Sequence, residues 1–353
     1  MTKDLQRQTP IASDERQIVD RITEHVGAYR REVVANYYVA LKTGCFVVLV
    51  GPDRQNQTRL AQGLADSLVG RSSLQLCAFQ AHPWWANSTG NPGQFATSHA
   101  QFNALKLLDF IDVASASEAA GFPYLFFSTI KRMSAAELEC YFHDLPQGLF
   151  WQADTSVISI DLPRNVYATG ILETEPSGPA LDKAIYRHAT VIPLPPGRLP
   201  RSAARRNPSP ERVDWQRAFS QSAVQSSKQA RAKLARILPD GQSSPAPIAD
   251  LDHVLWSVPL PPFARDQVWR YLANAFDRDG NGLFVATVDE NLRIAQDHAL
   301  AQYVLPHLDD QLSKRQPGAL KRVTEYLANR FPRAHAQAIG RREVSLDPAK
   351  WRA

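Results

Sequence analysis

Apolar residues recur at steps of three and four along residues 14–43 and mark one side of a helix. They are Ile18, Val19, Ile22, Val26, Val33, Tyr37 and Leu41. This spacing predicts an amphipathic helix, because about 3.6 residues complete one helical turn. Gly27 lies between two groups of these residues, and we expect the helix to break near it.

Short runs of β-branched and aromatic residues follow this helix and predict strands. They cover residues 46–50, 74–79, 124–127, 157–160 and 166–169. Helical patterns separate several of these runs, notably at residues 59–68 and 104–114. This alternation predicts an α/β fold with a largely parallel sheet flanked by helices.

The composition changes after Pro195 and Pro196. Ten Lys or Arg residues lie between Arg198 and Arg236, in a stretch also rich in Pro, Ser and Gln. Helical patterns return at residues 265–276, 292–304 and 320–331. We therefore expect four parts, which are an N-terminal tail (1–13), an α/β core (14–195), a basic insertion or linker (196–248) and a helical domain (249–353).

The overall composition is that of a globular protein. Of 353 residues, 44% are hydrophobic and 21% are charged, with a net charge of +5. No apolar run approaches the roughly 20 residues of a membrane span, and residues 1–16 have no apolar segment typical of a secretory signal, so we expect a cytoplasmic protein. The three cysteines are widely separated and suggest neither a zinc site nor a disulfide framework.

The segment "VVLVGPDRQNQTRLAQGLA", residues 47–65, has the order of a phosphate-binding P-loop. An apolar strand ends at a glycine, polar residues follow, and an amphipathic helix begins near Thr58. Alignment with the pattern GxxxxGK[ST] places Gly51 at the first glycine, Asn56 at the second, Gln57 at the lysine and Thr58 at the hydroxyl position. Gln57 is neutral and cannot balance phosphate charge as a lysine does.

Five segments in order resemble the McrB-like branch of the AAA+ ATPases. They are "NYYVALKTGCFVVLVGPDRQNQTRLAQGLA", "HPWWANSTGNPGQF", "PYLFFSTIKRMSAAELECYFHDL", "LPRNVYATGILETEPSGPALDKA" and "ALAQYVLPHLDDQL". The resemblance implies an AAA+ P-loop-type core followed by a C-terminal helical lid domain.

The chain departs from the McrB pattern at the catalytic positions. That pattern implies an acidic pair where Ser128 and Thr129 stand, an Asn at Glu173 and an Arg at Lys183. Hydroxyl groups can neither hold the Mg²⁺ shell as carboxylates do nor act as a base near neutral pH. We therefore expect a pseudo-ATPase with no catalytic residue, no metal site and no cofactor; nucleotide retained without hydrolysis is an open alternative.

The resemblance also implies a role for such a chain. Members of this family act through rings and couple to a nuclease, which indicates a structural or regulatory subunit of a prokaryotic DNA-restriction or anti-phage defence complex. The implied partners are active AAA+ subunits or a nuclease effector in a hetero-oligomer. Candidate residues for contact with a neighbouring subunit are Arg132, Lys183 and Arg187.

Two other functions are compatible with the sequence. The basic segment could bind nucleic acid, DNA included, through phosphate contacts, with Arg201, Arg205, Arg206, Arg212 and Arg217 as candidates, or it could be a solvated linker. The chain could also be a divergent but active NTPase, whose Mg²⁺-dependent turnover a substitution of Thr58 would abolish.

A second motif is incomplete. "DRDGNG", residues 277–282, matches the first half of a calcium-binding EF-hand loop, but Val288 stands where the bidentate Glu belongs. Because Asp, Asn and Gly are also common turn residues, we interpret the motif as a tight turn. We likewise interpret Trp84 and Trp85 as packing residues.

Overall fold

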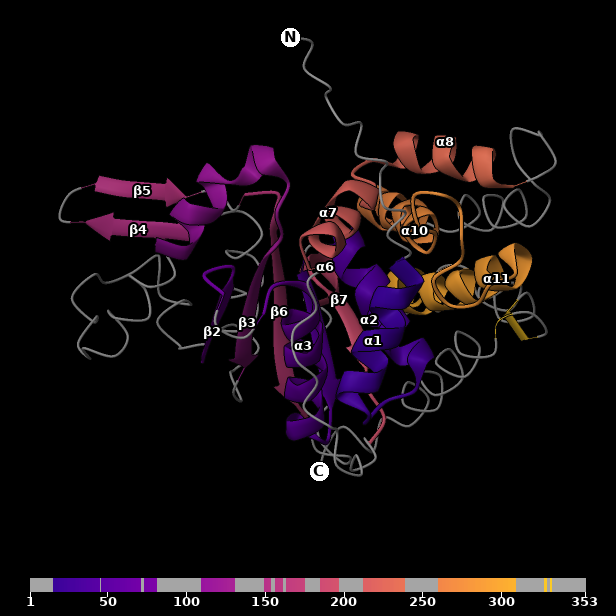
Figure 1. Ribbon diagram of the computed structural model, residues 1–353, viewed down its shortest axis with the longest axis horizontal. Helices are drawn as coiled ribbons and strands as arrows, with labels where there is room; N and C mark the ends of the chain where they lie inside the picture. The colour runs from indigo at the N-terminus through magenta and orange to yellow at the C-terminus, as the bar shows by residue number, and fades with distance from the viewer. Residues whose placement is uncertain are drawn as a thin grey trace, which may run out of the picture.

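The computed structural model describes twelve segments of the chain (Figure 1). These are residues 15–44, 46–70, 73–80, 109–130, 149–153, 156–160, 163–174, 185–196, 212–238, 260–308, 327–328 and 331. Within them, every helix is too short or too polar to cross a lipid bilayer.

The centre of the fold is a five-stranded parallel sheet, and this confirms the predicted α/β fold with a largely parallel sheet. Its strands are β1 (Phe46–Gly51), β2 (Leu76–Gln80), β3 (Tyr124–Ile130), β6 (Val166–Glu173) and β7 (Thr190–Pro193). They lie in the order β2-β3-β6-β1-β7, and every neighbouring pair is parallel. All six residues of β1 are buried because helices cover both faces, which explains its unbroken apolar run.

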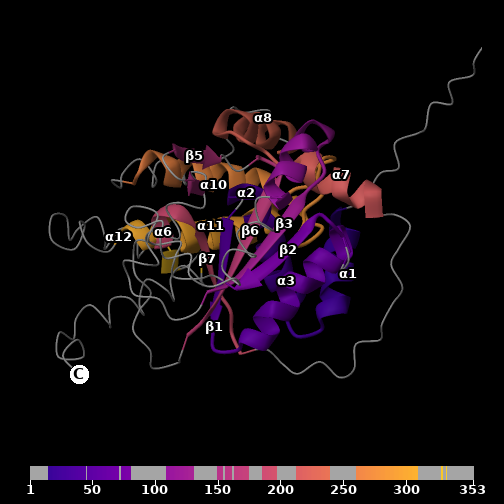
Figure 2. The same ribbon diagram turned by 90° about the vertical axis from the view of Figure 1, so that its left-hand side faces the viewer.

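Two helical layers enclose this sheet (Figures 1 and 2). Val47 and Leu49 of β1 join a large core with α1 (Glu15–Val26), α2 (Arg31–Gly44) and α3 (Arg54–Leu68). The other face of β1 packs with the helical residues 109–116 and with α6 (Ile185–His188). Gly27 separates α1 from α2 with φ of 62°, so the expected break in the N-terminal helix is confirmed.

Two parts of the sheet differ from the sequence prediction. Residues 157–160 do not join the parallel sheet, because β5 (Ser156–Ile160) pairs antiparallel with β4 (Leu149–Ala153) in a separate hairpin. This hairpin projects from one end of the molecule (Figure 1). The sequence prediction also omits β7, a four-residue edge strand that ends in Pro193, where a missing amide hydrogen is tolerated.

The second half of the basic segment is folded. It forms α7 (Arg212–Ser222) and α8 (Ser227–Ile237), and both contribute to the large core. Phe219 of α7 makes edge-on ring contacts with Tyr38 and Tyr167, at centroid distances of 5.1 and 4.9 Å. Helices α7 and α8 are therefore packed on the hydrophobic core, so this half of the basic segment is not a solvated linker.

The described residues of the C-terminal region are mainly helical. It contains α10 (Pro262–Asn274), α11 (Val288–Ala299), the π-helical turn η4 (Leu300–Val304) and α12 (Leu305–Leu308). The short helix η3 (Glu118–Ala120) precedes β3 in the first half of the chain. Asn36 of α2 accepts hydrogen bonds from Tyr271 of α10 and Gln302 of η4. These helices thus share one core with the N-terminal helices.

Candidate functional site

The loop between β1 and α3 is much shorter than the P-loop pattern predicts. Helix α3 begins at Arg54, so only Pro52 and Asp53 separate it from Gly51. Asn56, Gln57 and Thr58 consequently lie in the first turns of the helix, and the expected helix start near Thr58 is wrong. A P-loop binds phosphate with the backbone N–H groups of an extended loop, and this chain has no such loop after β1.

The carboxylate of Asp53 occupies the start of α3. Its Oδ1 accepts a hydrogen bond from the backbone N–H of Asn56 at 3.0 Å, and its Oδ2 accepts one from the Asn56 side chain at 2.6 Å. Asp53 is therefore the N-cap of the helix and partners a donor that an anion would otherwise contact.

The next two polar residues face the interior. Asn56 and Gln57 are each 1% exposed, and Gln57 Nε2 lies 3.5 Å from the carbonyl oxygen of Leu172 in β6. A Cβ atom on Gly51 would lie 3.0 Å from this same nitrogen and 2.6 Å from the carbonyl oxygen of Leu194. Gly51 is required for this close packing, and Gln57 points at the sheet where a P-loop lysine would reach a phosphate.

The hydroxyl of Thr58 is also engaged within the helix. Its Oγ1 donates to the carbonyl oxygen of Arg54 at 2.8 Å. A P-loop Ser or Thr instead turns its hydroxyl to Mg²⁺.

The substituted positions on the strands lie toward the carboxyl edge of the sheet. Glu173, the last residue of β6, is in register with Gly51 and is exposed. Ser128 is fully buried in β3, and Thr129 is in register with Ile171 of β6. In the segments that the structure describes, no three His, Cys, Asp or Glu side chains are placed to hold a metal ion.

Most of the basic residues predicted to bind partners cannot be placed. Arg132, Lys183, Arg201, Arg205 and Arg206 lie outside the described residues, as do Trp84 and Trp85. Arg187 falls in α6 and Arg212 begins α7, but their side chains are not described. Arg217 is exposed on α7.

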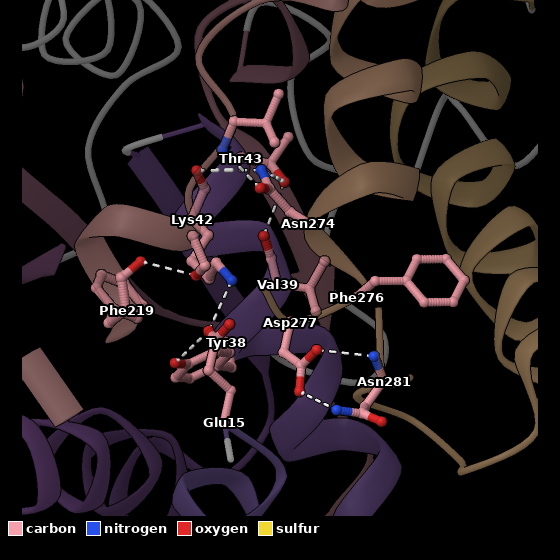
Figure 3. Close-up of polar contacts among 12 residues, drawn as sticks. Glu15, Tyr38, Val39, Lys42, Thr43, Phe219, Asn274, Phe276, Asp277 and Asn281 are labelled. Carbon is pink, nitrogen blue, oxygen red and sulfur yellow. Dashed lines mark hydrogen bonds and ion pairs between the residues drawn. The ribbon is translucent and has the colours of Figure 1, made fainter. Parts of the chain in front are cut away.

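A buried ion pair that the sequence interpretation missed joins α1 to α2 (Figure 3). Lys42 Nζ lies 2.7 Å from Glu15 Oε1, and the two side chains are 0% and 1% exposed. The hydroxyl of Tyr38 donates to the same carboxylate oxygen at 2.9 Å, and the Lys42 ammonium lies 5.5 Å from the Tyr38 ring centroid. Burial, the Glu15 charge and this hydrogen bond raise the pKa of Tyr38 far above its usual value.

The "DRDGNG" segment forms a tight turn after α10 (Figure 3). Asp277 is 2% exposed, and its carboxylate accepts hydrogen bonds from the backbone of Asp279 and Asn281 and from the Asn281 side chain. Phe276 and Gly282 form a β-bridge that closes the turn, and Gly280 has φ of 93°. The carboxylate that an EF-hand would turn to calcium thus accepts hydrogen bonds within the turn.

Lys233 of α8 contacts this turn and is influenced by the charges of the ion pair. Its Nζ donates to the carbonyl oxygen of Phe276 at 2.7 Å. Burial and the nearby Lys42 charge lower its pKa from 10.5 to about 7, against the opposing effects of Glu15 and Asp277 and with a smaller lowering by Arg236.

This lowered pKa predicts a pH dependence of stability. Between pH 7 and the unfolded value of 10.5 the unfolded chain binds more protons at Lys233 than the folded chain, so stability should rise with pH. From pH 7.5 to 9.5 the gain in unfolding free energy should be about 2 kcal/mol greater in the wild type than in Lys233→Met. Urea unfolding of both proteins at pH 7.5 and 9.5 measures this difference in unfolding free energy. Lys228→Met, on the exposed face of the same helix, should keep the wild-type dependence; equal profiles for Lys233→Met and the wild type would contradict the assignment.

Comparison with known proteins adds no family assignment. No protein-family model matches the chain, and no curated protein sequence matches it.

Proposed function

We propose that this chain is a catalytically inactive, McrB-like AAA+ subunit. In this proposal it is a structural or regulatory component of a cytoplasmic prokaryotic DNA-restriction or anti-phage complex, and its C-terminal helices correspond to the lid. The parallel sheet, with β1 between β6 and β7 and α3 directly after it, is compatible with a P-loop-type core.

The Asp53 carboxylate at the start of α3 is the main support for the proposal that the subunit is catalytically inactive. Two unit charges of the same sign about 4 Å apart repel by about 4 kcal/mol at an effective dielectric constant of about 20. The favourable effect of a helix N-terminus on an anion is only about 0.3–1 kcal/mol. For a phosphate beside Asp53, the repulsion by the carboxylate is therefore larger than the favourable energy from the helix N-terminus.

The side chains at the positions of the catalytic groups also support an inactive subunit. Gln57 is buried against β6, the Thr58 hydroxyl bonds within α3, and the acidic pair is replaced by Ser128 and Thr129. A protein with this set of groups contributes surface to an assembly while other subunits supply hydrolysis.

Nucleotide binding is the direct test. Calorimetry with Mg²⁺–ATP and Mg²⁺–GTP should give no saturable heat at about 1 mM nucleotide, near the upper end of ordinary substrate constants, and the same sample should show no hydrolysis. Asp53→Asn keeps a good helix cap and removes the charge, so any gain in nucleotide affinity in that variant isolates the effect of the carboxylate. Mg²⁺-dependent turnover that Thr58→Ala abolishes would instead establish a divergent active NTPase.

Assembly tests the other half of the proposal. The chain should be co-expressed with an active McrB-like subunit from the same organism. We expect the two proteins to elute as one complex on size-exclusion chromatography with light scattering. Separate elution of the two proteins, with and without nucleotide, would refute the assignment as a ring subunit.

A further inference from the structure

The outer face of α8 is strongly basic and lies at the periphery of the molecule (Figures 1 and 2). The helix contains four basic residues and no acidic residue, in the sequence SKQARAKLARI. Three of them are exposed, namely Lys228, Arg231 and Arg236, while Lys233 turns inward to Phe276. Ala230 and Leu234 are buried and fix the opposite face on the core.

The exposed residues lie on one side of the helix. Lys228, Arg231, Ala232, Ala235 and Arg236 follow each other at steps of three, one, three and one, so they share one face. Between Lys228 and Arg236 the helix rises by about 12 Å, at about 1.5 Å per residue. Each DNA strand has one phosphate per about 3.4 Å of duplex axis, so a length of about 12 Å along the axis covers about three to four phosphate repeats of one strand.

Arg231 is held in place on this face. Its guanidinium lies 3.9 Å from the ring centroid of the buried Trp269. An arginine stacked in this way loses less side-chain entropy when it binds a phosphate than a freely moving one.

Among the described residues, the acidic neighbours of this face are paired with basic ones. Asp266 accepts a hydrogen bond from the backbone of Ser227 at the start of α8, and its carboxylate lies 3.9 Å from the guanidinium of Arg270. At the other end, Gly280 approaches Ile237, and the turn there exposes both Arg278 and Asp279, whose charges cancel.

We propose that this basic face, formed by Lys228, Arg231 and Arg236, binds the phosphate backbone of duplex DNA without sequence specificity. The alanines between the basic residues leave room for close approach to the backbone. The face has no aromatic side chain on which single-stranded bases could stack and no large apolar side chain that would enter a membrane. A helix about 10–12 Å wide also fits the roughly 12 Å major groove of B-form DNA, whereas the major groove of A-form RNA is too narrow for it.

The face lies within the basic segment that the sequence suggested, but its three residues are not among the five candidate arginines. Of those five arginines only Arg217 has a described side chain, and it lies on α7. The proposal does not rest on the AAA+ assignment, because none of its residues belongs to the β1–α3 loop.

Fluorescence anisotropy with a labelled random-sequence DNA duplex tests the proposal in the full-length protein without nucleotide. Titrations at several KCl concentrations give the dissociation constant and its salt dependence. The variant Lys228→Gln/Arg236→Gln removes two exposed charges and leaves the Arg231–Trp269 stack intact. Its affinity should fall about tenfold at about 0.1 M salt, and the slope of log K against log salt should decrease by about two, since each phosphate contact contributes about 0.9.

The matched control is Arg54→Gln/Arg293→Gln, which removes the same net charge from exposed positions on α3 and α11. The control should bind within twofold of the wild type, and thermal unfolding should confirm that both variants are folded. Equal weakening of both variants would overturn the proposal in favour of a general charge effect. Absence of binding by the wild type would also overturn it, as would preference for an RNA duplex or for vesicles containing phosphatidylserine.

Discussion

Replacing Lys42 with Met should lower the free energy of unfolding by about 3–5 kcal/mol, the range for breaking one side of a buried ion pair. The substitution would leave the Glu15 carboxylate 1% exposed, with the Tyr38 hydroxyl as a neutral donor. Among the described residues, Glu15 Oε2 has no hydrogen-bond partner, so the Tyr38 hydroxyl would be the remaining donor to this carboxylate. Urea-induced unfolding followed by circular dichroism measures the effect.

The double variant Glu15→Gln/Lys42→Met separates the charge from the packing. It removes both ions, so its loss of stability should be smaller than the sum of the losses in the two single variants. Additive losses, or a loss below about 1 kcal/mol in Lys42→Met, would show that the pair is not buried as described.

Replacing Asn291 with Ala should lower the unfolding free energy by about 2–4 kcal/mol, because several buried backbone groups would lose a partner. Asn291 is fully buried at the start of α11. Its Oδ1 accepts hydrogen bonds from the backbone of Phe284 at 2.8 Å and Val285 at 3.4 Å, and its Nδ2 donates to Ala275 at 3.0 Å. One side chain thus fixes both ends of the turn between α10 and α11.

The control for this variant is Arg293→Ala, on the exposed side of the same helix. It should change stability by less than about 0.5 kcal/mol, as exposed substitutions usually do. If Asn291→Ala were equally mild under thermal and urea unfolding, the turn would have to be held by its other contacts, such as the hydrogen bond from Arg31 to Leu283.

The sequence predicted the parts of the fold that depend on local pattern. The period of apolar residues located α1 and α2, and the run of β-branched residues at 46–50 located β1. Strand β7 was missed because four residues ending in proline carry little periodic signal. Residues 157–160 of β5 were wrongly placed in the sheet because a β-rich run does not show which strand it pairs with, and its partner β4 was not predicted.

The site was predicted less well for a different reason. The P-loop pattern directed attention to Thr58 as the helix start, although Asp53 is a good N-cap residue and was the available signal for a start at Arg54. Lys42 directly follows the apolar run of residues 37–41 in α2. A charged residue at the end of such a run is the sequence signal of a buried charge. Its partner Glu15 lies 27 residues away, and no spacing rule could identify it.

The hydrogen bonds to Asn36 determine how the chain can be divided. Tyr271 and Gln302 come from the C-terminal region, yet both meet an amide of α2 that is 4% exposed. A fragment ending after β7 would expose this amide together with the apolar surface of α2 that α10 covers. We therefore expect that the α/β part does not fold without the C-terminal helices and that truncation after β7 yields aggregation-prone chains.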